Sequence, residues 1–332
     1  MTRHSEKGYK MKRIISFSGK FAIATALVAS LAVSSLAQAS LRKAMDFDGD
    51  GKADLAIFRP VNSTWYIMKS GGTFTFQQWG IANEDFMTPG DYDGDGKGDL
   101  AVWRDTTGDW FWLASSDNSY HVVHWGATND EPVARDYDGD GKTDLAVVRR
   151  TNGQMIWFVL GSQNQSYIAV QWGLSSDFAT PGDYDGDGKF DFTIQRPGGS
   201  ATAQSVFWIL RSSDLGAGVV SFGVTNDVVV PGDYDGDGKT DLAVVREGPT
   251  PDTNLTWYIL RSSDAGFSIY TFGVTGADIT AQADYDGDGK TDIAIWREPT
   301  GDFWIQRSSD GAWTTTHWGQ PSDQPIAVFD MH

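Results

Sequence analysis

The sequence predicts an all-β fold, a β-propeller of four-stranded blades, and three observations lead to this prediction. A nine-residue acidic segment occurs six times, starting at Asp46, Asp91, Asp136, Asp183, Asp233 and Asp284. The starts are 45, 45, 47, 50 and 51 residues apart, a period typical of repeat architectures. Each unit also contains four short β-forming runs with an aromatic residue at a fixed place. Six units predict six blades, and a seven-bladed ring with one incomplete blade is the alternative.

The four runs of a unit follow one another in a constant order. A first run, such as residues 145–149, follows the acidic segment and ends in arginine. The second run is aromatic, as in residues 157–160, and the third ends in an aromatic-glycine pair such as Trp172-Gly173. A shorter fourth run leads into the next acidic segment. Residues 326–329 form a fourth-type run with no acidic segment after it, so we expect them to pair with the first blade and close the ring. Residues 41–45 compete for the same place.

Each acidic segment has Asp at positions 1, 3, 5 and 9, Gly at 4 and 6, and Lys at 7. Four carboxylates so close together repel one another unless a cation lies among them. Oxygen ligands at alternate positions of a tight loop suit Ca²⁺, and glycine permits the positive φ angles that wrap the chain around an ion. A single copy could be a solvated turn, but six copies with the same four Asp positions predict about six bound calcium ions.

The predicted ligands are the four carboxylates of each segment and the main-chain carbonyl of the lysine, whose side chain is then free to point to water. They are Asp46, Asp48, Asp50, Lys52, Asp54, Asp91, Asp93, Asp95, Lys97, Asp99, Asp136, Asp138, Asp140, Lys142, Asp144, Asp183, Asp185, Asp187, Lys189, Asp191, Asp233, Asp235, Asp237, Lys239, Asp241, Asp284, Asp286, Asp288, Lys290 and Asp292.

Other calcium motifs do not fit these segments. An EF-hand needs a bidentate Glu at position 12 and a following helix, whereas no copy has Glu there and the following residues are strand-like, as in Leu100-Ala101-Val102-Trp103. The glycine-rich nonapeptide of calcium β-rolls is absent as well.

The segment Asp-Tyr-Asp-Gly-Asp-Gly-Lys-Thr-Asp-Leu resembles the FG-GAP/VCBS repeats of integrin-α-like β-propellers, and the resemblance covers about residues 41–332. It implies that the acidic loop joins the first two strands of a blade and that Asp 1, 3, 5 and 9, with the carbonyl of position 7, bind Ca²⁺. The Phe-Gly and Gly-Ala-Pro segments that give the family its name are only loosely present, as in Phe222-Gly223 and Phe272-Gly273. The resemblance therefore implies a metal role more strongly than an integrin-like partner.

Residues 1–39 have the pattern of a secretory signal peptide, with Lys12 and Arg13 before the apolar residues 21–33 and Ala37-Gln38-Ala39 before Ser40. We therefore expect residues 40–332 to form a single exported propeller domain, secreted or at the cell surface, with the periplasm as a further destination. An uncleaved anchor is the alternative. We expect no transmembrane segment in the mature chain.

The charge of the chain has its main source in the acidic segments. Residues 1–39 hold six basic residues and one acidic residue, so residues 40–332 hold 20 basic and 43 acidic residues, a net charge of −23. The six segments supply 24 of these acids. Such a surface repels nucleic acid. The chain has no cysteine, so metal ions take the place of disulfides in holding its loops.

Two further sets of residues recur once per unit. We expect the repeated Trp and Phe to fill the spaces between blades, with sugar stacking as the alternative. We expect the arginines that end the first runs to form structural ion pairs with an Asp after each third run. These residues are Arg59, Arg104, Arg149, Arg196, Arg246 and Arg297, and Asp85, Asp130, Asp177, Asp227, Asp278 and Asp323. His121, His124 and His317 have no repeated partner in this interpretation and are assigned to the surface or to packing.

The sequence therefore predicts a secreted, monomeric, calcium-binding propeller that acts as a binding or adhesion module for a glycan or protein. It contains no Gly-x-Ser-x-Gly elbow, phosphate-binding glycine loop or His-rich zinc spacing, so we assign no catalytic residue. A polysaccharide-active, lyase-like enzyme and a purely structural surface protein are the alternatives. Longer connections at residues 197–205 and 247–256 indicate a binding surface on the face opposite the calcium loops, with tolerated length variation of a surface loop as the alternative.

Overall fold

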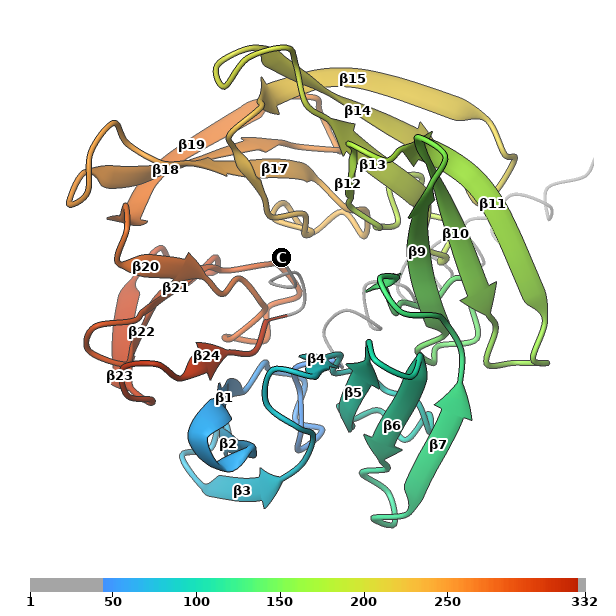
Figure 1. The fold of residues 1–332 in the computed structure, drawn as a ribbon. Helices are drawn as coiled ribbons and strands as arrows, with labels where there is room; N and C mark the ends of the chain where they lie inside the picture. Colours follow the sequence, from blue (N-terminus) through green and yellow to red (C-terminus); the bar gives the residue numbers. More distant parts are fainter. Residues whose placement is uncertain (1–43, 328–332) are drawn as a thin grey trace, which may run out of the picture.

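The computed structural model describes residues 44–327, which form six four-stranded antiparallel sheets around a central axis, as Figure 1 shows. This confirms the β-propeller and settles the blade number at six. The expected signal peptide, residues 1–39, lies outside the described residues. In residues 44–327 no helix has the length and apolar character needed to span a membrane.

The first three blades each contain four strands. The first contains β24 (Gln324–Pro325), β1 (Leu55–Arg59), β2 (Thr64–Met68) and β3 (Phe74–Gln78), with the short 3-10 helix η1 (Pro60–Asn62) between β1 and β2. The second contains β4 (Asp85–Met87), β5 (Leu100–Arg104), β6 (Asp109–Leu113) and β7 (Tyr120–His124). The third contains β8 (Glu131–Pro132), β9 (Leu145–Thr151), β10 (Gln154–Leu160) and β11 (Tyr167–Leu174).

The remaining blades repeat this order. The fourth contains β12 (Phe178–Ala179), β13 (Phe192–Arg196), β14 (Gln204–Leu210) and β15 (Ala217–Val224). The fifth contains β16 (Val228–Val229), β17 (Leu242–Arg246), β18 (Asn254–Leu260) and β19 (Phe267–Val274). The sixth contains β20 (Asp278–Thr280), β21 (Ile293–Arg297), β22 (Asp302–Gln306) and β23 (Trp313–His317).

Each short fourth run forms the innermost strand of the blade that follows it, and the third runs form the outer edge of the ring (Figure 1). The C-terminal run therefore completes the first blade, as the sequence indicated. The pairing begins two residues earlier than expected, because Gln324 pairs with Phe58 and Pro325 with Ile57. The N–H of Ile326 then donates to the carbonyl oxygen of Ala56. Residues 328 and 329 of the expected run lie outside the described residues.

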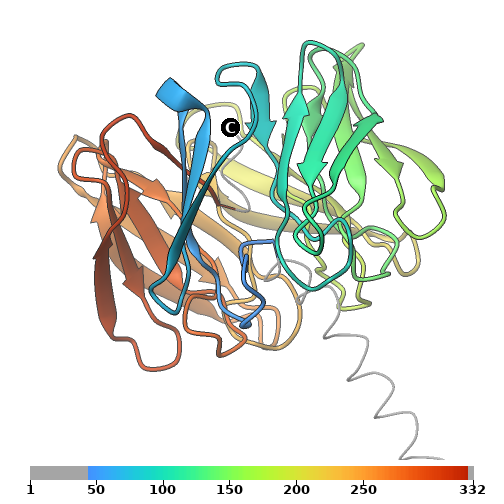
Figure 2. The same cartoon turned by 90° about the horizontal axis from the view of Figure 1, so that it is seen from below.

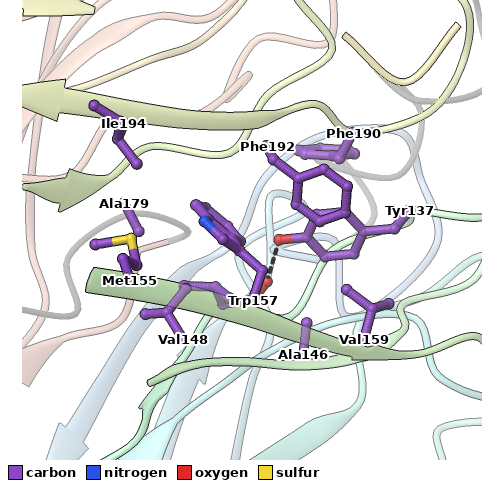
Figure 3. Close-up of a cluster of buried hydrophobic side chains, with 11 residues drawn as sticks. Tyr137, Ala146, Val148, Met155, Trp157, Val159, Ala179, Phe190, Phe192 and Ile194 are labelled. Carbon is purple, nitrogen blue, oxygen red and sulfur yellow. Dashed lines mark hydrogen bonds between the residues drawn. The ribbon is translucent and has the colours of Figure 1, made fainter. Parts of the chain in front are cut away.

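The core lies between neighbouring blades, where one aromatic residue of each second strand is buried to 1% exposure or less. These residues are Trp65, Trp110, Trp157, Phe207, Trp257 and Phe303. Figure 3 shows one such contact, in which Trp157 of the third blade packs with Phe192 and Ile194 of the fourth. The rings of Trp157 and Phe192 meet edge to face with centroids 5.5 Å apart. The repeated aromatic residues are thus core residues, whose burial each contributes on the order of 2–3 kcal/mol.

The acidic segments lie at one end of the first strands and the hairpins between first and second strands lie at the other. In the third blade the acidic segment ends at Asp144, directly before β9, and the hairpin follows β9 at Asn152. Figure 2 shows the ring from the side, with connections gathered at both ends of the strands. The longer connections after Arg196 and Arg246 therefore lie on the face opposite the acidic loops, as expected.

Candidate metal centres

Each acidic segment is a tight loop that leads into the first strand of its unit. In the second to sixth blades it joins the innermost strand to that first strand, as the resemblance implied, whereas the first loop precedes β1, whose inner neighbour β24 comes from the C-terminal end of the described chain. In the third blade, Gly139 and Gly141 have φ angles of 79° and 87°, which a side chain would strain. Asp136 at position 1 accepts hydrogen bonds from both glycine N–H groups, over 2.7 and 2.9 Å. The same two bonds, of 2.6–3.1 Å, occur in the other five loops.

The aspartate at position 9 ties the loop to the connection between the second and third strands. In the third blade one oxygen of Asp144 accepts the N–H of Tyr137 and the other accepts the N–H of Ser162 over 2.6 Å. A serine N–H holds the position-9 aspartate of every other loop in the same way. The hydroxyl of this serine donates to the aspartate at position 5 in all six loops. Sequence reasoning missed these serines, although the repeated Ser after each second run was a usable signal.

The loop brings carboxylate oxygens together in a cluster. In the loops that start at Asp91, Asp136, Asp183 and Asp233, one oxygen each from positions 1, 3 and 9 lies within 4.8 Å of the others. In the first loop the corresponding set is Asp46, Asp48 and Asp50, which are positions 1, 3 and 5. In all five of these loops the position-5 carboxylate also accepts hydrogen bonds from the serine hydroxyl and from the N–H of the position-7 lysine.

The electrostatics of the clusters favour a bound cation. Burial, with the charge of neighbouring aspartates as a smaller cause, raises the pKa of Asp136 to about 7 and of Asp144 to about 6. The pKa values of Asp183 and Asp191 rise in the same way. Buried carboxyl groups with raised pKa values gain from a nearby positive charge, because it offsets both desolvation and mutual repulsion.

The donor set fits a hard divalent ion. Oδ1 of Asp48 and Oδ1 of Asp138, both at position 3, are buried and accept no hydrogen bond from any described residue. A buried oxygen that accepts no hydrogen bond lowers the stability of the fold, and coordination of a metal ion would offset this loss. Carboxylate oxygens without nitrogen or sulfur donors are the ligands that Ca²⁺ and Mg²⁺ prefer, and a flexible set of this kind suits Ca²⁺ better than the strict octahedron of Mg²⁺.

The lysine at position 7 differs from expectation, because its side chain does not point to water. It lies across the loop of the preceding blade, where it covers the glycine at position 4. A methyl group on Gly139 would lie 3.0 Å from Cγ of Lys189, and one on Gly287 would lie 3.0 Å from Cγ of Lys52. Nζ of Lys142 also donates to the main-chain oxygen of Asp93 in the neighbouring loop over 2.9 Å. The reason is that consecutive acidic loops are in direct contact in the ring, which the sequence alone does not indicate.

Main-chain hydrogen bonds join the loops into a ring. The N–H of position 8 in each loop donates to the carbonyl oxygen of position 1 in the preceding loop, over 2.7–2.9 Å. The six donors are Ala53, Gly98, Thr143, Phe190, Thr240 and Thr291, and their acceptors are Asp284, Asp46, Asp91, Asp136, Asp183 and Asp233 in the same order. A candidate metal centre therefore shares a hydrogen bond with the centre on each side.

The six predicted arginine–aspartate pairs are present, with one N–O distance of 2.7–2.8 Å in each. Each aspartate side chain is at most 1% exposed, and each guanidinium lies 4.3–5.2 Å from the centre of an aromatic ring. In the second blade, Arg104 and Asp85 are directly opposite each other on β5 and β4. The pairs therefore join the two inner strands of one blade, and Arg59 with Asp323 joins the two ends of the described chain.

Two histidines lie at the surface, as expected, but each has a repeated partner that the sequence interpretation did not give it. His124 and His317 contact aspartates at equivalent places, because Nδ1 of each lies 2.8 Å from Oδ1 of Asp109 or Asp302 on the neighbouring strand. The sequence did not reveal these pairs, since the partners lie 15 residues apart across a hairpin. His121 is a packing residue, stacked on Trp112 with ring centroids 4.9 Å apart.

The fold and its ring of acidic loops define a six-bladed β-propeller with repeated candidate metal sites. The sequence profile of the FG-GAP-like repeat matches residues 46–102 and 136–194. The chain thus contains FG-GAP-like repeats over these two ranges, in agreement with the resemblance of its loops. No curated protein matches the chain.

Solved structures share the fold at low sequence identity. AofleA from Arthrobotrys oligospora is 10% identical, with 87% of this chain and 90% of that chain covered and a TM-score of 0.52. A lectin from Agrocybe aegerita that recognises non-reducing terminal N-acetylglucosamine is 13% identical, with 84% and 91% covered and a TM-score of 0.50. TolB from Acinetobacter baumannii is 13% identical, with a TM-score of 0.48. This chain is 82% covered in that comparison but spans only 63% of TolB. These likenesses show the fold alone.

Proposed function

We propose that this protein is an exported, calcium-stabilised β-propeller that acts as a binding module for a glycan. Residues 1–39 are its signal peptide, and residues 40–332 form one monomeric domain. About six Ca²⁺ ions bind the loops through the aspartates at positions 1, 3, 5 and 9 and the carbonyl of the position-7 lysine. A calcium-dependent fold suits an exported chain, because extracellular modules bind Ca²⁺ with a Kd of about 10⁻⁴ to 10⁻³ M.

The observation that carries the metal part of this proposal is the convergence of buried carboxylate oxygens in successive loops. Asp136, Asp138 and Asp144 supply oxygens within 4.8 Å of one another, and one of these side chains has a buried oxygen with no hydrogen-bond donor among the described residues. When an ion is bound, it supplies the positive charge that holds these carboxylates together. The residues of the chain then fix the two ends of each loop, through the glycine N–H groups and the serine of the next connection.

Support for a glycan partner comes from exposed aromatic side chains on the outer strands. The outer strands expose aromatic rings, among them Phe74, Tyr120, Tyr167, Phe267 and Trp313, each at least 59% exposed. Exposed rings flanked by hydroxyl and charged groups are suited to ligands with both polar and apolar faces. The lectin from Agrocybe aegerita recognises a saccharide on a propeller fold, so an architecture of this class is compatible with saccharide recognition.

Two measurements test this proposal. Calorimetric titration of calcium-free protein with Ca²⁺ and with Mg²⁺, at millimolar concentrations, should show saturable binding of about six Ca²⁺ ions and a preference for Ca²⁺. No binding of Ca²⁺ contradicts the metal assignment. Incubation of the calcium-loaded protein with a panel of polysaccharides should show retention without product release. Steady release of product supports the polysaccharide-active enzyme instead, and an empty glycan and protein screen supports the purely structural protein.

A further inference from the structure

We propose that a cleft between the fifth and sixth blades binds a single ring of a neutral saccharide, an inference that rests on the proposed glycan-binding function. The cleft has a volume of about 300 Å³, within the range of roughly 300–1,000 Å³ of small-molecule sites. The fifth blade contributes Arg261, Ser268 and Tyr270 to its lining, and the sixth contributes Gln306 and Arg307. Asp235 and Lys290 of the acidic loops complete one wall.

Tyr270 gives this cleft a surface that the equivalent positions of the other blades lack. It lies on β19 opposite the buried Trp257 and is 39% exposed. The residues opposite the corresponding core aromatic in the other blades are Gln77, Val123, Val170, Val220 and Thr316. The departure is therefore specific to the fifth blade. A tyrosine ring presents a flat apolar face with a polar tip, which matches the C–H face and the hydroxyl edge of a sugar ring.

The polar side chains of the cleft are positioned to form hydrogen bonds with the hydroxyl groups of a sugar. Arg261 donates Nε and Nη2 to the carboxylate of Asp264 and Nη1 to the hydroxyl of Ser268, over 2.6–3.0 Å. Arg307 is held in the same way by Asp310. Both carboxylates remain more than half exposed, at 56% and 51% of their side-chain surface. Arg261 and Arg307 line the cleft and are held in position by carboxylates that lie outside its lining, so the cleft offers oriented charged donors to the hydroxyls of a sugar.

The charge balance distinguishes a neutral saccharide from an anionic one. Arg261 and Arg307 are already paired with their own aspartates, and Lys290 lies in the same cleft as Asp235. Three positive side chains, Arg261, Lys290 and Arg307, and one negative one, Asp235, line the cleft, and Asp264 and Asp310 beside it neutralise the two arginines. A neutral polyhydroxylated ring makes hydrogen bonds here without leaving a charge unpaired, whereas an anion at Arg261 or Arg307 would compete with the carboxylate already paired there.

The wall of the cleft belongs to two candidate metal loops, so binding of the saccharide depends on calcium. Asp235 is position 3 of the fifth loop and forms a cluster with Asp233 and Asp241. Lys290 and Thr291 of the sixth loop cover the fifth, since the N–H of Thr291 donates to the carbonyl oxygen of Asp233 over 2.7 Å. Asp233, Asp235 and Asp241 would hold an ion in the fifth loop, and its charge would offset the mutual repulsion of these carboxylates.

The test is titration of the calcium-loaded protein with N-acetylglucosamine, galactose, mannose and glucuronate, followed by calorimetry or ligand-observed NMR. We expect millimolar binding of at least one neutral sugar, weakened at least tenfold in Y270V and in R261Q. Y270V restores the residue that the second, third and fourth blades carry at this position. R211Q is the matched control, because Arg211 forms the same pair with Asp214 in the fourth blade, outside the cleft.

Each result decides between the proposals. If a sugar binds and both variants bind it as well as the wild type does, the cleft assignment is wrong and glycan binding stands. Stronger binding of glucuronate than of the neutral sugars overturns the assignment of a neutral ligand. If no sugar binds at high millimolar concentration, the glycan proposal fails together with the cleft. Melting curves in calcium that match the wild type show that the variants are folded.

Discussion

The main-chain N–H of Ala53 donates to the carbonyl oxygen of Asp284 over 2.7 Å, which joins the acidic loop of the first blade to that of the last. Five equivalent bonds join the remaining neighbours. The candidate metal centres are thus connected in a closed ring, in which the conformation of one loop affects the conformation of the next. Occupancy of one site should favour occupancy of its neighbours, because an ordered loop holds the main-chain partner of the loop beside it.

Calcium should therefore stabilise the protein strongly, and the loss of one ligand should affect more than one site. At a free Ca²⁺ concentration 100 times Kd, one site adds about 2.7 kcal/mol to the free energy of unfolding. D136N should lower the number of ions bound and reduce the rise in Tm with calcium. E247Q, on an exposed acid of the opposite face, is the control. Titration calorimetry and melting curves measure both effects, and six independent, unaltered sites in D136N would contradict the prediction.

The calcium-free protein should become less stable as pH rises. The pKa of Asp136 is about 7 and that of Asp144 about 6 in the fold, above the ordinary value of 3.8. A carboxyl group whose pKa is higher in the folded than in the unfolded protein contributes most to the free energy of unfolding below its unfolded pKa. This contribution is lost as the pH rises through its folded pKa. Stability without calcium should thus fall between about pH 4 and pH 7.

With saturating calcium the trend in this window should reverse, because the ion binds deprotonated carboxylates. Urea unfolding of dialysed protein at pH 5 and pH 8, with and without calcium, tests both trends. A calcium-free protein that is equally stable at the two pH values contradicts the raised pKa values.

R149M should lower stability without removing one discrete activity. The change leaves the buried carboxylate of Asp130 without its bidentate partner, and breaking a buried pair in this way costs about 3 kcal/mol. R211M is the matched control, since its partner Asp214 is 58% exposed and exposed pairs contribute only about 0–1 kcal/mol. Chemical denaturation measures the difference. An unchanged unfolding curve together with a lost activity would show a functional role instead.

G232A should destabilise the contact between the fifth and sixth blades by about 1–3 kcal/mol. A methyl group on Gly232 would lie 2.7 Å from Oγ1 of Thr291, too close for van der Waals contact. Adding T291A should restore part of the lost stability, because the equivalent pair between the sixth and first blades is Ala283 and Ala53.

G71A is the control for this pair of variants, because a methyl group on Gly71 meets no atom within 4 Å. The double variant and the single variant are compared by thermal unfolding in calcium. Equal melting temperatures for G232A and G71A would show that the steric argument is wrong.

Much of this organisation follows from short-range patterns in the sequence. The spacing of the aspartates predicted the loops, since carboxylates at fixed alternate positions have few other uses. The recurring Arg and Asp predicted the six ion pairs. A charged residue at the same position of every unit, next to a buried strand, needs an oppositely charged partner at another repeated position. The run at the C-terminus predicted ring closure for the same reason, since an unpaired inner strand matched an unfilled place in the first blade.

The features that were missed depend on contacts between segments that are distant in sequence. The direction of the Lys142 side chain is set by the preceding loop, which is 49 residues away. The pair of His124 and Asp109 depends on the register of β6 and β7, which one residue of slippage would break. The cleft at Tyr270 depends on how two blades face each other. None of these distances can be read from the order of residues alone.

Closure of the first blade by β24 has a consequence for biogenesis. Phe58 of β1 pairs with Gln324 of β24, so the first blade to be synthesised is the last to be completed. Pairing over such a separation is slow, and it cannot occur before nearly all of the propeller has been synthesised. With export and calcium binding as proposed above, the ring would close only after the chain has crossed the membrane, where calcium is available to the loops.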